Sequence, residues 1–179
     1  YDTFGPELSF GRTLQNKLPG NIAIAKFTHS GSQMNDWTPE GSMAKTRHIY
    51  PRFISFVKKS IAELEHKGHE VELAGVFYHV GENDMSMPSY RKVAAQRLSS
   101  TVAQSRKDLD LPALKWYVSQ QPPTDDKRVN SIDVTSELEK VAAADGDLIH
   151  IKAFDLPQQE KKLVIDTAGI VRLGEVIAE

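Results

Sequence analysis

Val71-Glu-Leu-Ala-Gly-Val-Phe-Tyr-His-Val-Gly-Glu-Asn-Asp-Met85 is the stretch that decides the fold of this 179-residue chain. Its first part, up to Val80, is apolar and β-branched enough to form a buried strand. The strand runs directly into a polar cluster made of His79, Gly81, Glu82, Asn83 and Asp84. In an open parallel sheet, side chains that bind or react lie just past the carboxyl ends of strands. The stretch therefore indicates either a functional rim or an ordinary turn, because Gly, Asn and Asp are also common turn residues.

Strand and helix patterns alternate along the rest of the chain. Apolar residues recur every three or four positions in five segments, which predicts helices at 6–18, 49–64, 89–109 (capped by Ser89), 131–144 and from 167 onward. Short apolar runs predict strands at 21–27, 71–80, 113–120 and 147–151. This alternation predicts one α/β domain over residues 1–179, with a parallel sheet between two layers of helices. The loops 28–46, 80–88 and 120–130 are expected to meet at one rim.

Composition and charge exclude several functional classes. Hydrophobic residues make up 40% and charged residues 26% of the chain, as in ordinary globular proteins. The net charge is -2 and basic residues are dispersed, so no nucleic-acid surface is expected. No apolar run is long enough to cross a bilayer. The absence of cysteine excludes disulfides, thiolate nucleophiles and cysteine-bound metals, and no His, Asp and Glu spacing predicts a metal or cofactor site.

The order of several short motifs resembles the sialate O-acetylesterase-like branch of the SGNH hydrolases, which includes family-6 carbohydrate esterases. The matching pieces are Gly5-Pro6-Glu7-Leu8-Ser9-Phe10-Gly11, Ile24-Ala25-Lys26-Phe27 followed by Ser30-Gly31, Asp36-Trp37, Gly75 to Asp84, Asp155-Leu156-Pro157 and Asp166-Thr167-Ala168-Gly169. The resemblance covers nearly the whole chain. It implies a flavodoxin-like three-layer fold, hydrolysis of acetyl esters on sugars, and a carbohydrate ligand. Members of that family are often secreted or periplasmic, whereas the sequence of this chain indicates no particular compartment.

The positions that carry the family's chemistry depart from its pattern. An esterase of this kind needs a nucleophilic serine, a histidine base, an orienting aspartate and oxyanion donors. The resemblance places the serine before Gly5, where only four residues stand, and an Asp-x-x-His just before Asp166. Lys161 and Val164 occupy those aspartate and histidine positions, and Val80 replaces an expected oxyanion glutamine. The chain is therefore interpreted as a degenerate esterase, or as a non-catalytic relative that binds a carbohydrate or another partner.

Some residues remain candidates for the pocket. The resemblance implies that the backbone N–H of Gly31 is an oxyanion donor, and Asn83 in Gly81-Glu82-Asn83-Asp84 is a candidate for the second donor. Glu82 is expected to bind a sugar hydroxyl or to tie loops together, and we favour the loop role. His79 is expected to face the pocket or, more simply, to pack inside.

Three further residues each have a functional interpretation and a simpler structural one. Ser30 follows the wrong strand to be the family nucleophile. Trp37 is a candidate for stacking on a sugar ring, although an aromatic anchor for its loop is the simpler interpretation. His150 ends a literal Asp-x-x-His, but residues three apart on a strand point to opposite faces, so we interpret it as an ordinary strand-end histidine.

The resemblance also has a structural consequence for the sheet. It places the family's first strand in the middle of the sheet, between 21–27 and 71–80, and that strand has no counterpart in the chain. Buried backbone groups without partners cost roughly 1–3 kcal/mol each, against a total stability of about 5–15 kcal/mol. We therefore expect an N-terminal segment or another chain to complete the sheet, and direct pairing of the two flanking strands would contradict this.

Overall fold

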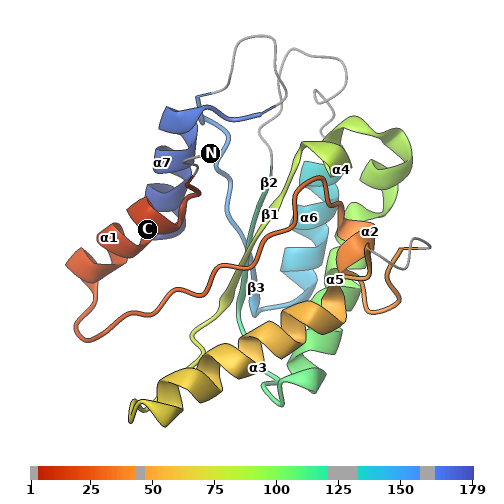
Figure 1. Ribbon diagram of the computed structural model, residues 1–179. Coiled ribbons are helices and arrows are strands. Elements are labelled where there is room, and N and C mark those ends of the chain that lie inside the picture. The colour runs from red at the N-terminus through yellow and green to blue at the C-terminus, as the bar shows by residue number, and fades with distance from the viewer. Residues whose placement is uncertain (1–3, 43–46, 121–132, 158–163) are drawn as a thin grey trace.

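A parallel sheet forms the centre of the molecule. The structure is a computed structural model that describes residues 4–42, 47–120, 133–157 and 164–179. Within these residues the sheet has the order β1-β2-β3, with β1 (Val76–Val80), β2 (Trp116–Gln120) and β3 (Leu148–His150) running parallel (Figure 1). Val76 lies opposite Trp116, which in turn lies opposite Leu148. The predicted parallel α/β architecture is therefore confirmed.

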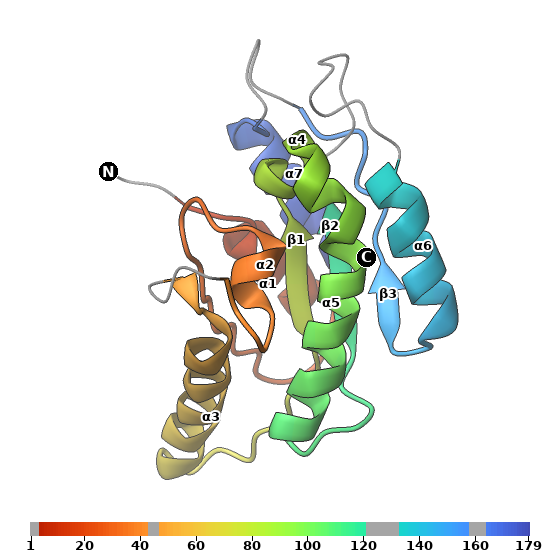
Figure 2. The same ribbon diagram turned by 90° about the vertical axis from the view of Figure 1, so that its right-hand side faces the viewer.

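Helices cover both faces of this sheet. In chain order they are α1 (Glu7–Lys17), α2 (Met34–Trp37), α3 (Tyr50–His66), α4 (Glu82–Ser86), α5 (Pro88–Asp108), α6 (Asp133–Ala144) and α7 (Thr167–Ile177). Figure 1 shows α1 and α7 together on one side of the sheet and α3, α5 and α6 on the other, which makes three layers. The view in Figure 2 places the short helices α2 and α4 close to the upper end of β1. No helix in the described part of the chain is long and apolar enough to span a membrane.

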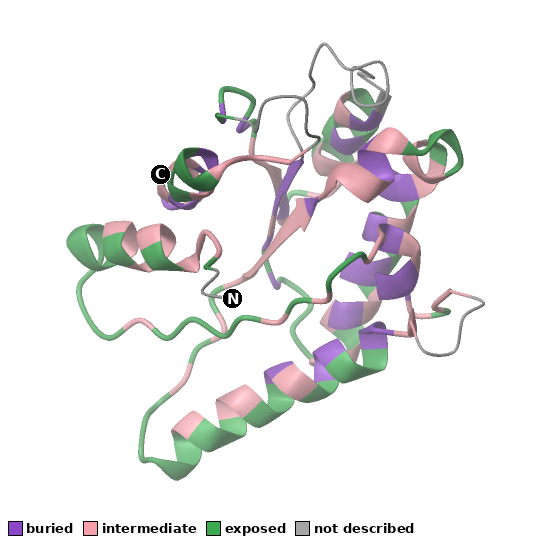
Figure 3. Ribbon diagram, turned by 45° about the horizontal axis from the view of Figure 1, so that its top comes forward, coloured by how far each residue is buried: buried purple, intermediate pink, exposed green. Residues whose placement is uncertain are grey.

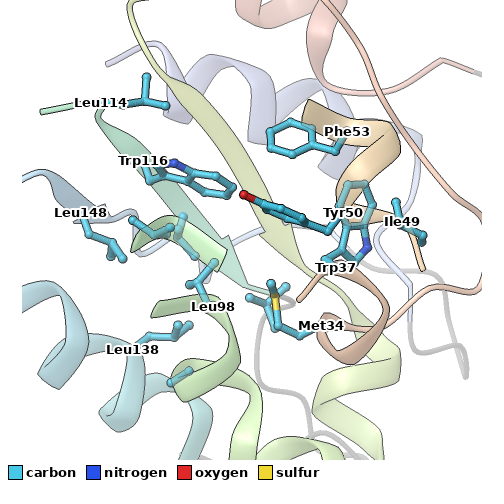
Figure 4. Packing of buried hydrophobic residues seen from close by; sticks show 14 of the residues in the cluster. Met34, Trp37, Ile49, Tyr50, Phe53, Leu98, Leu114, Trp116, Leu138 and Leu148 are labelled. Atoms are coloured by element: carbon cyan, nitrogen blue, oxygen red, sulfur yellow. The ribbon is translucent and has the colours of Figure 1, made fainter. Parts of the chain in front are cut away.

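The main hydrophobic core lies between the sheet and α3, α5 and α6. Its largest fully buried side chains include Trp116 from β2, Leu98 from α5 and Leu138 from α6. Figure 4 shows Trp37 and Phe53 close to this group, and their rings pack edge to face with centroids 6.2 Å apart. This core follows from the sequence because α3 and α5 carry apolar residues at the helical spacing.

A smaller cluster joins α7 to the opposite face of the sheet. Leu173 of α7 is buried with Ala153 and Leu156, and Phe77 of β1 packs against them. Asp166 caps α7, since its Oδ1 accepts a hydrogen bond from the N–H of Gly169 at 2.8 Å. α1 packs against α7.

Several details of the expected elements are wrong, among them the start of the strand expected at 71–80, since β1 begins at Val76. Helix α5 begins at Pro88 with Met87 as its N-cap, two residues before the expected Ser89 cap, because proline suits the first helical position. Residues 21–27 form no strand, although they run extended beside the sheet (Figure 1). A strand needs a ladder partner, and no described residue forms a backbone hydrogen bond with this segment.

Candidate functional site

The polar rim lies where β1 ends and meets the loop that contains α2. The carboxylate of Asp84 accepts the backbone N–H of Met34 with both oxygens, at 3.0 and 2.9 Å. Asn83 Nδ2 donates to the carbonyl of Ser32 at 3.2 Å. These contacts join residues about fifty positions apart in the chain, so the two loops form one unit.

Asp84 is a buried carboxylate, with only 2% of its surface exposed. Burial raises its pKa to about 6, with smaller contributions in the same direction from the charges of Asp36 and Glu82. The Met34 N–H and the charge of Arg97 act in the opposite direction because they favour the ionised form. The carboxyl group therefore titrates near pH 6. It joins two loops rather than lining an open pocket.

A second buried carboxylate, Asp36, closes the first turn of α2. Its Oδ2 accepts the N–H of Gln33 at 3.1 Å and lies 3.7 Å from Nη1 of Arg47. Its Oδ1 is buried without a hydrogen-bond partner in the described part of the chain. Asp36 therefore holds the shape of the loop that carries Gly31 to the rim.

Gly31 lies in the conformation that glycine favours, with φ at +68°. Its carbonyl accepts from Arg47 Nη1 at 3.1 Å, whereas no described residue accepts its N–H. Within the described part of the chain this N–H is therefore without an acceptor, as an oxyanion donor needs to be. Neighbouring Ser30 is exposed, and its carbonyl lies 3.1 Å from His29 Nδ1.

Gly81 borders open space at the end of β1. A Cβ added to it would meet no atom within 4 Å. Glu82 is half-buried and has no hydrogen bond or ion pair with any described residue, and its loop-tying role stays a prediction. Among the described residues, Asn83 and Asp84 join the two loops.

His79 and Ser119 form a pair that the sequence did not reveal. His79 Nδ1 lies 2.7 Å from Ser119 Oγ, and the two residues are opposite each other on β1 and β2. Burial lowers the pKa of His79 to about 4, so the imidazole is neutral at physiological pH. Ser119 is fully buried, which makes the pair a cross-strand contact and agrees with the packed interpretation of His79.

The remaining candidate site residues that the structure describes are buried or half-buried. Val80 is fully buried in the core, and Val164 is half-buried. Lys161 lies outside the described residues. Both ring nitrogens of His150 are buried, and no described residue forms a hydrogen bond with either of them. Trp37 is 9% exposed and donates from Nε1 to Ser32 Oγ at 3.0 Å, so it anchors its loop rather than stacking on a sugar.

The described residues offer no group of three or more His, Cys, Asp or Glu side chains suited to a metal ion. A hollow of about 410 Å³ lies on the outer side of α3 and α5, where Tyr50 and Asp108 line it. The Tyr50 hydroxyl donates to Asp108 at 2.6 Å, so these polar groups are satisfied by each other. The rim around Gly31, Gly81 and Asn83 is therefore the better candidate site.

The three-layer fold and the position of this rim define an α/β protein of the SGNH hydrolase type. The sequence profile of the family described as carbohydrate esterase, sialic acid-specific acetylesterase, matches residues 1–179. The chain belongs to that family. The resemblance drawn from its motifs is therefore confirmed.

The comparison with solved structures agrees with the fold. The chain is similar to a protein from Arabidopsis thaliana solved by X-ray crystallography, with a TM-score of 0.74 and 19% sequence identity. The match covers 98% of this chain and 66% of that protein, so this chain spans slightly less than two thirds of its length. No curated protein matches the sequence.

Proposed function

We propose that the rim formed by Gly31, Gly81 and Asn83 binds an O-acetylated carbohydrate, and that these 179 residues do not by themselves hydrolyse its ester. Membership of the carbohydrate esterase family supports the ligand class. The observation that carries the proposal is that no described residue accepts the N–H of Gly31, in the loop that Asn83 joins through Ser32 to the end of β1, where Gly81 borders open space. A backbone N–H in this setting can donate a hydrogen bond to the carbonyl oxygen of an acetyl group as well as to a developing oxyanion.

The residues at the chemical positions support the loss of hydrolysis. Val164 stands where the family has its base, and a valine side chain cannot accept a proton. The side chains of Ser119 and His79 are in hydrogen-bond contact, but this serine is fully buried. His79 is also a weak base, because its pKa is lowered to about 4.

A labelling and binding experiment tests both halves of the proposal. The chain is treated with a saturating fluorophosphonate probe, and p-nitrophenyl acetate turnover is measured in parallel. We expect no stoichiometric labelling and turnover no faster than buffer. Peracetylated methyl xyloside is then titrated, with unacetylated methyl xyloside as the matched ligand, and Asn83→Ala is compared with Glu137→Ala, an exposed α6 control.

The outcomes distinguish a non-catalytic carbohydrate-binding protein from an active esterase. Preferential binding of the acetylated sugar, weakened in Asn83→Ala alone, supports the binding function. Stoichiometric labelling with turnover would instead establish an active serine esterase and overturn the non-catalytic reading. Equal binding of both sugars would overturn recognition of the acetyl group.

A further inference from the structure

The hollow on the outer side of α3 and α5 has no part in the proposed function. It measures about 410 Å³ and shares no residue with the rim. Its lining consists of Pro39, Tyr50, Pro51, Ile54, Gln104 and Asp108. Figure 3 shows the buried residues of α3 gathered toward its N-terminal end, which is the end that borders the hollow. The volume falls within the range of about 300–1,000 Å³ that small-molecule sites occupy.

A carboxylate in a fixed orientation lines one part of the hollow. Asp108 Oδ2 accepts the Tyr50 hydroxyl at 2.6 Å, and Asp108 Oδ1 accepts Gln104 Nε2 at 2.9 Å. Each oxygen of a carboxylate accepts two hydrogen bonds, so each keeps one acceptor position. No described residue donates to these two positions or to Oε1 of Gln104. Three oxygen atoms of one hydrogen-bonded group are therefore open to the donors of a ligand.

The stability of α5 does not explain a carboxylate at this position. Asp108 is the last residue of α5, where the helix dipole favours cations over anions. Arg106 and Lys107, the two residues before it, follow that preference. The acidic side chain is instead held toward the hollow by donors from two different helices.

The charges around the hollow favour a neutral ligand. Hydrogen bonds from Tyr50 and Gln104, followed by the charges of Lys58 and Lys107, lower the pKa of Asp108, which is therefore ionised at neutral pH. A cationic ligand is repelled by both lysines, and an anionic ligand meets the carboxylate directly. Hydroxyl groups of a neutral ligand donate strong, charge-assisted hydrogen bonds to the carboxylate without either penalty.

The rest of the lining is apolar. Pro39, Pro51 and Ile54 have no hydrogen-bonding group in their side chains. Ile54 is 8% exposed and lies at the base, whereas Pro51 is exposed at the margin. A ligand that fits both parts has C–H groups on one face and hydroxyl groups on its edge. A neutral sugar ring is built in this way.

We propose that the hollow is a second carbohydrate-binding site, which holds one neutral sugar residue of a glycan chain. Two neighbouring hydroxyl groups of the sugar donate to Asp108 and Gln104, and its C–H face lies against Pro39, Pro51 and Ile54. Because the hollow is open to solvent, the glycan chain can continue from it. The inference does not rest on the proposed function of the rim, since the two sites share no residue and the hollow needs no acetyl group.

A residue-resolved NMR titration of the natural protein tests the proposal. The probes are xylotetraose and cellotetraose, which are neutral and have no acetyl groups. We expect at least one of them to cause saturable shift changes at the amides of Tyr50, Ile54, Gln104 and Asp108. Because shifts at the rim are observed separately, failure of the hollow and failure of the rim are distinguishable.

Two variants with matched controls locate the binding. Asp108→Asn removes the charge and one acceptor, and we expect it to weaken binding by about 10-fold or more. Asp110→Asn is its control, since Asp110 is exposed and asparagine tolerates its φ of +56°.

Gln104→Ala removes a neutral partner and is expected to weaken binding by about 3-fold. Gln96→Ala, at an exposed position of the same helix outside the hollow, is its control. Both controls are expected to change the affinity by less than about 2-fold.

Three results would overturn the proposal. The first is the absence of shift changes around the hollow with either oligosaccharide up to its solubility limit. The second is unchanged affinity in Asp108→Asn with a lower melting temperature, which would make the bond between Tyr50 and Asp108 a tie between two helices only. The third is tighter binding of tetralysine or tetragalacturonate at the same amides, which would assign the hollow to a charged ligand.

Discussion

Helices α1 and α5 differ greatly in how much they bury, although both are amphipathic segments of the same domain. α5 buries several residues, among them Leu98 and Val102, over the paired strands β1 and β2. α1 buries none of its residues, and Leu8 is 63% exposed. The difference indicates that the number of residues a helix buries in this molecule depends on whether a strand lies beneath it. α5 has one, whereas α1 packs against α7 and segment 21–27 beside the open edge of β1.

The largest expected effect comes from the paired side of the molecule. Trp116→Ala removes a side chain that is 2% exposed at the centre of the main core. We expect the free energy of unfolding, measured by urea titration, to fall by about 3–5 kcal/mol because a large cavity remains. Leu8→Ala on α1 is the matched variant and is expected to change it by less than about 0.5 kcal/mol. Similar losses in both variants would contradict the comparison between the two helices.

The next largest effect is a pH dependence of stability, to which Asp84 and His79 contribute in opposite directions. Asp84 has a folded pKa of about 6, above the unfolded value near 4, so its contribution to stability falls as pH rises from 4 to 6. His79 has a folded pKa of about 4, below the unfolded value near 6.5, so its contribution rises with pH over the same window. Each change amounts to about 3 kcal/mol at most. The two contributions nearly cancel in the wild-type chain.

Two single variants separate these contributions. In Asp84→Asn, stability measured by urea unfolding should rise between pH 4 and 6.5, because the contribution of His79 is no longer opposed by that of Asp84. In His79→Gln, stability should fall between pH 4 and 6, because the contribution of Asp84 is no longer opposed by that of His79. The same pH profile in both variants would show that neither side chain has the pKa described above.

A substitution at Gly174 tests the packing of α7 against α1, the helix that buries none of its residues. A Cβ on Gly174 of α7 would lie on the Pro6 carbonyl and on the Ser9 hydroxyl at the start of α1. We expect Gly174→Ala to cost about 1–3 kcal/mol and to free α1, seen as faster amide exchange confined to 7–17. Gly146→Ala is the control, since its Cβ would meet no atom within 4 Å. Unchanged exchange in α1 would show that α1 does not depend on this contact.

The smallest effect concerns the cap of α7. Asp166→Ala removes the acceptor for the N–H of Gly169 and should lower the free energy of unfolding by about 1 kcal/mol. Asp166→Asn keeps a side-chain acceptor and should retain most of that stability. Equal losses in the two variants would mean that the charge of Asp166, rather than its hydrogen bond, stabilises the helix.

Local patterns predicted the elements well where a partner was present. The apolar run before Gly81 became β1, and the spacing from Ile49 onward became α3. The same reasoning was wrong for 21–27, because apolar alternation indicates a strand but cannot supply the neighbour whose hydrogen bonds define one. The cap of α5 was misplaced because Ser89 is a favoured cap residue, whereas Pro88 in fact occupies the first turn.

The sequence by itself determined the family and the α/β architecture, since motif order and the spacing of apolar residues are properties of the chain alone. The departures from the family pattern at Lys161, Val164 and Val80 stay predictions. Only the tertiary structure decided that Asp84 reaches Met34, that His79 meets Ser119, and that one edge of β1 has no partner among the described residues. Those contacts join residues forty to fifty positions apart, and local propensity carries no information about them. They depend on which strands and loops the folded sheet brings together.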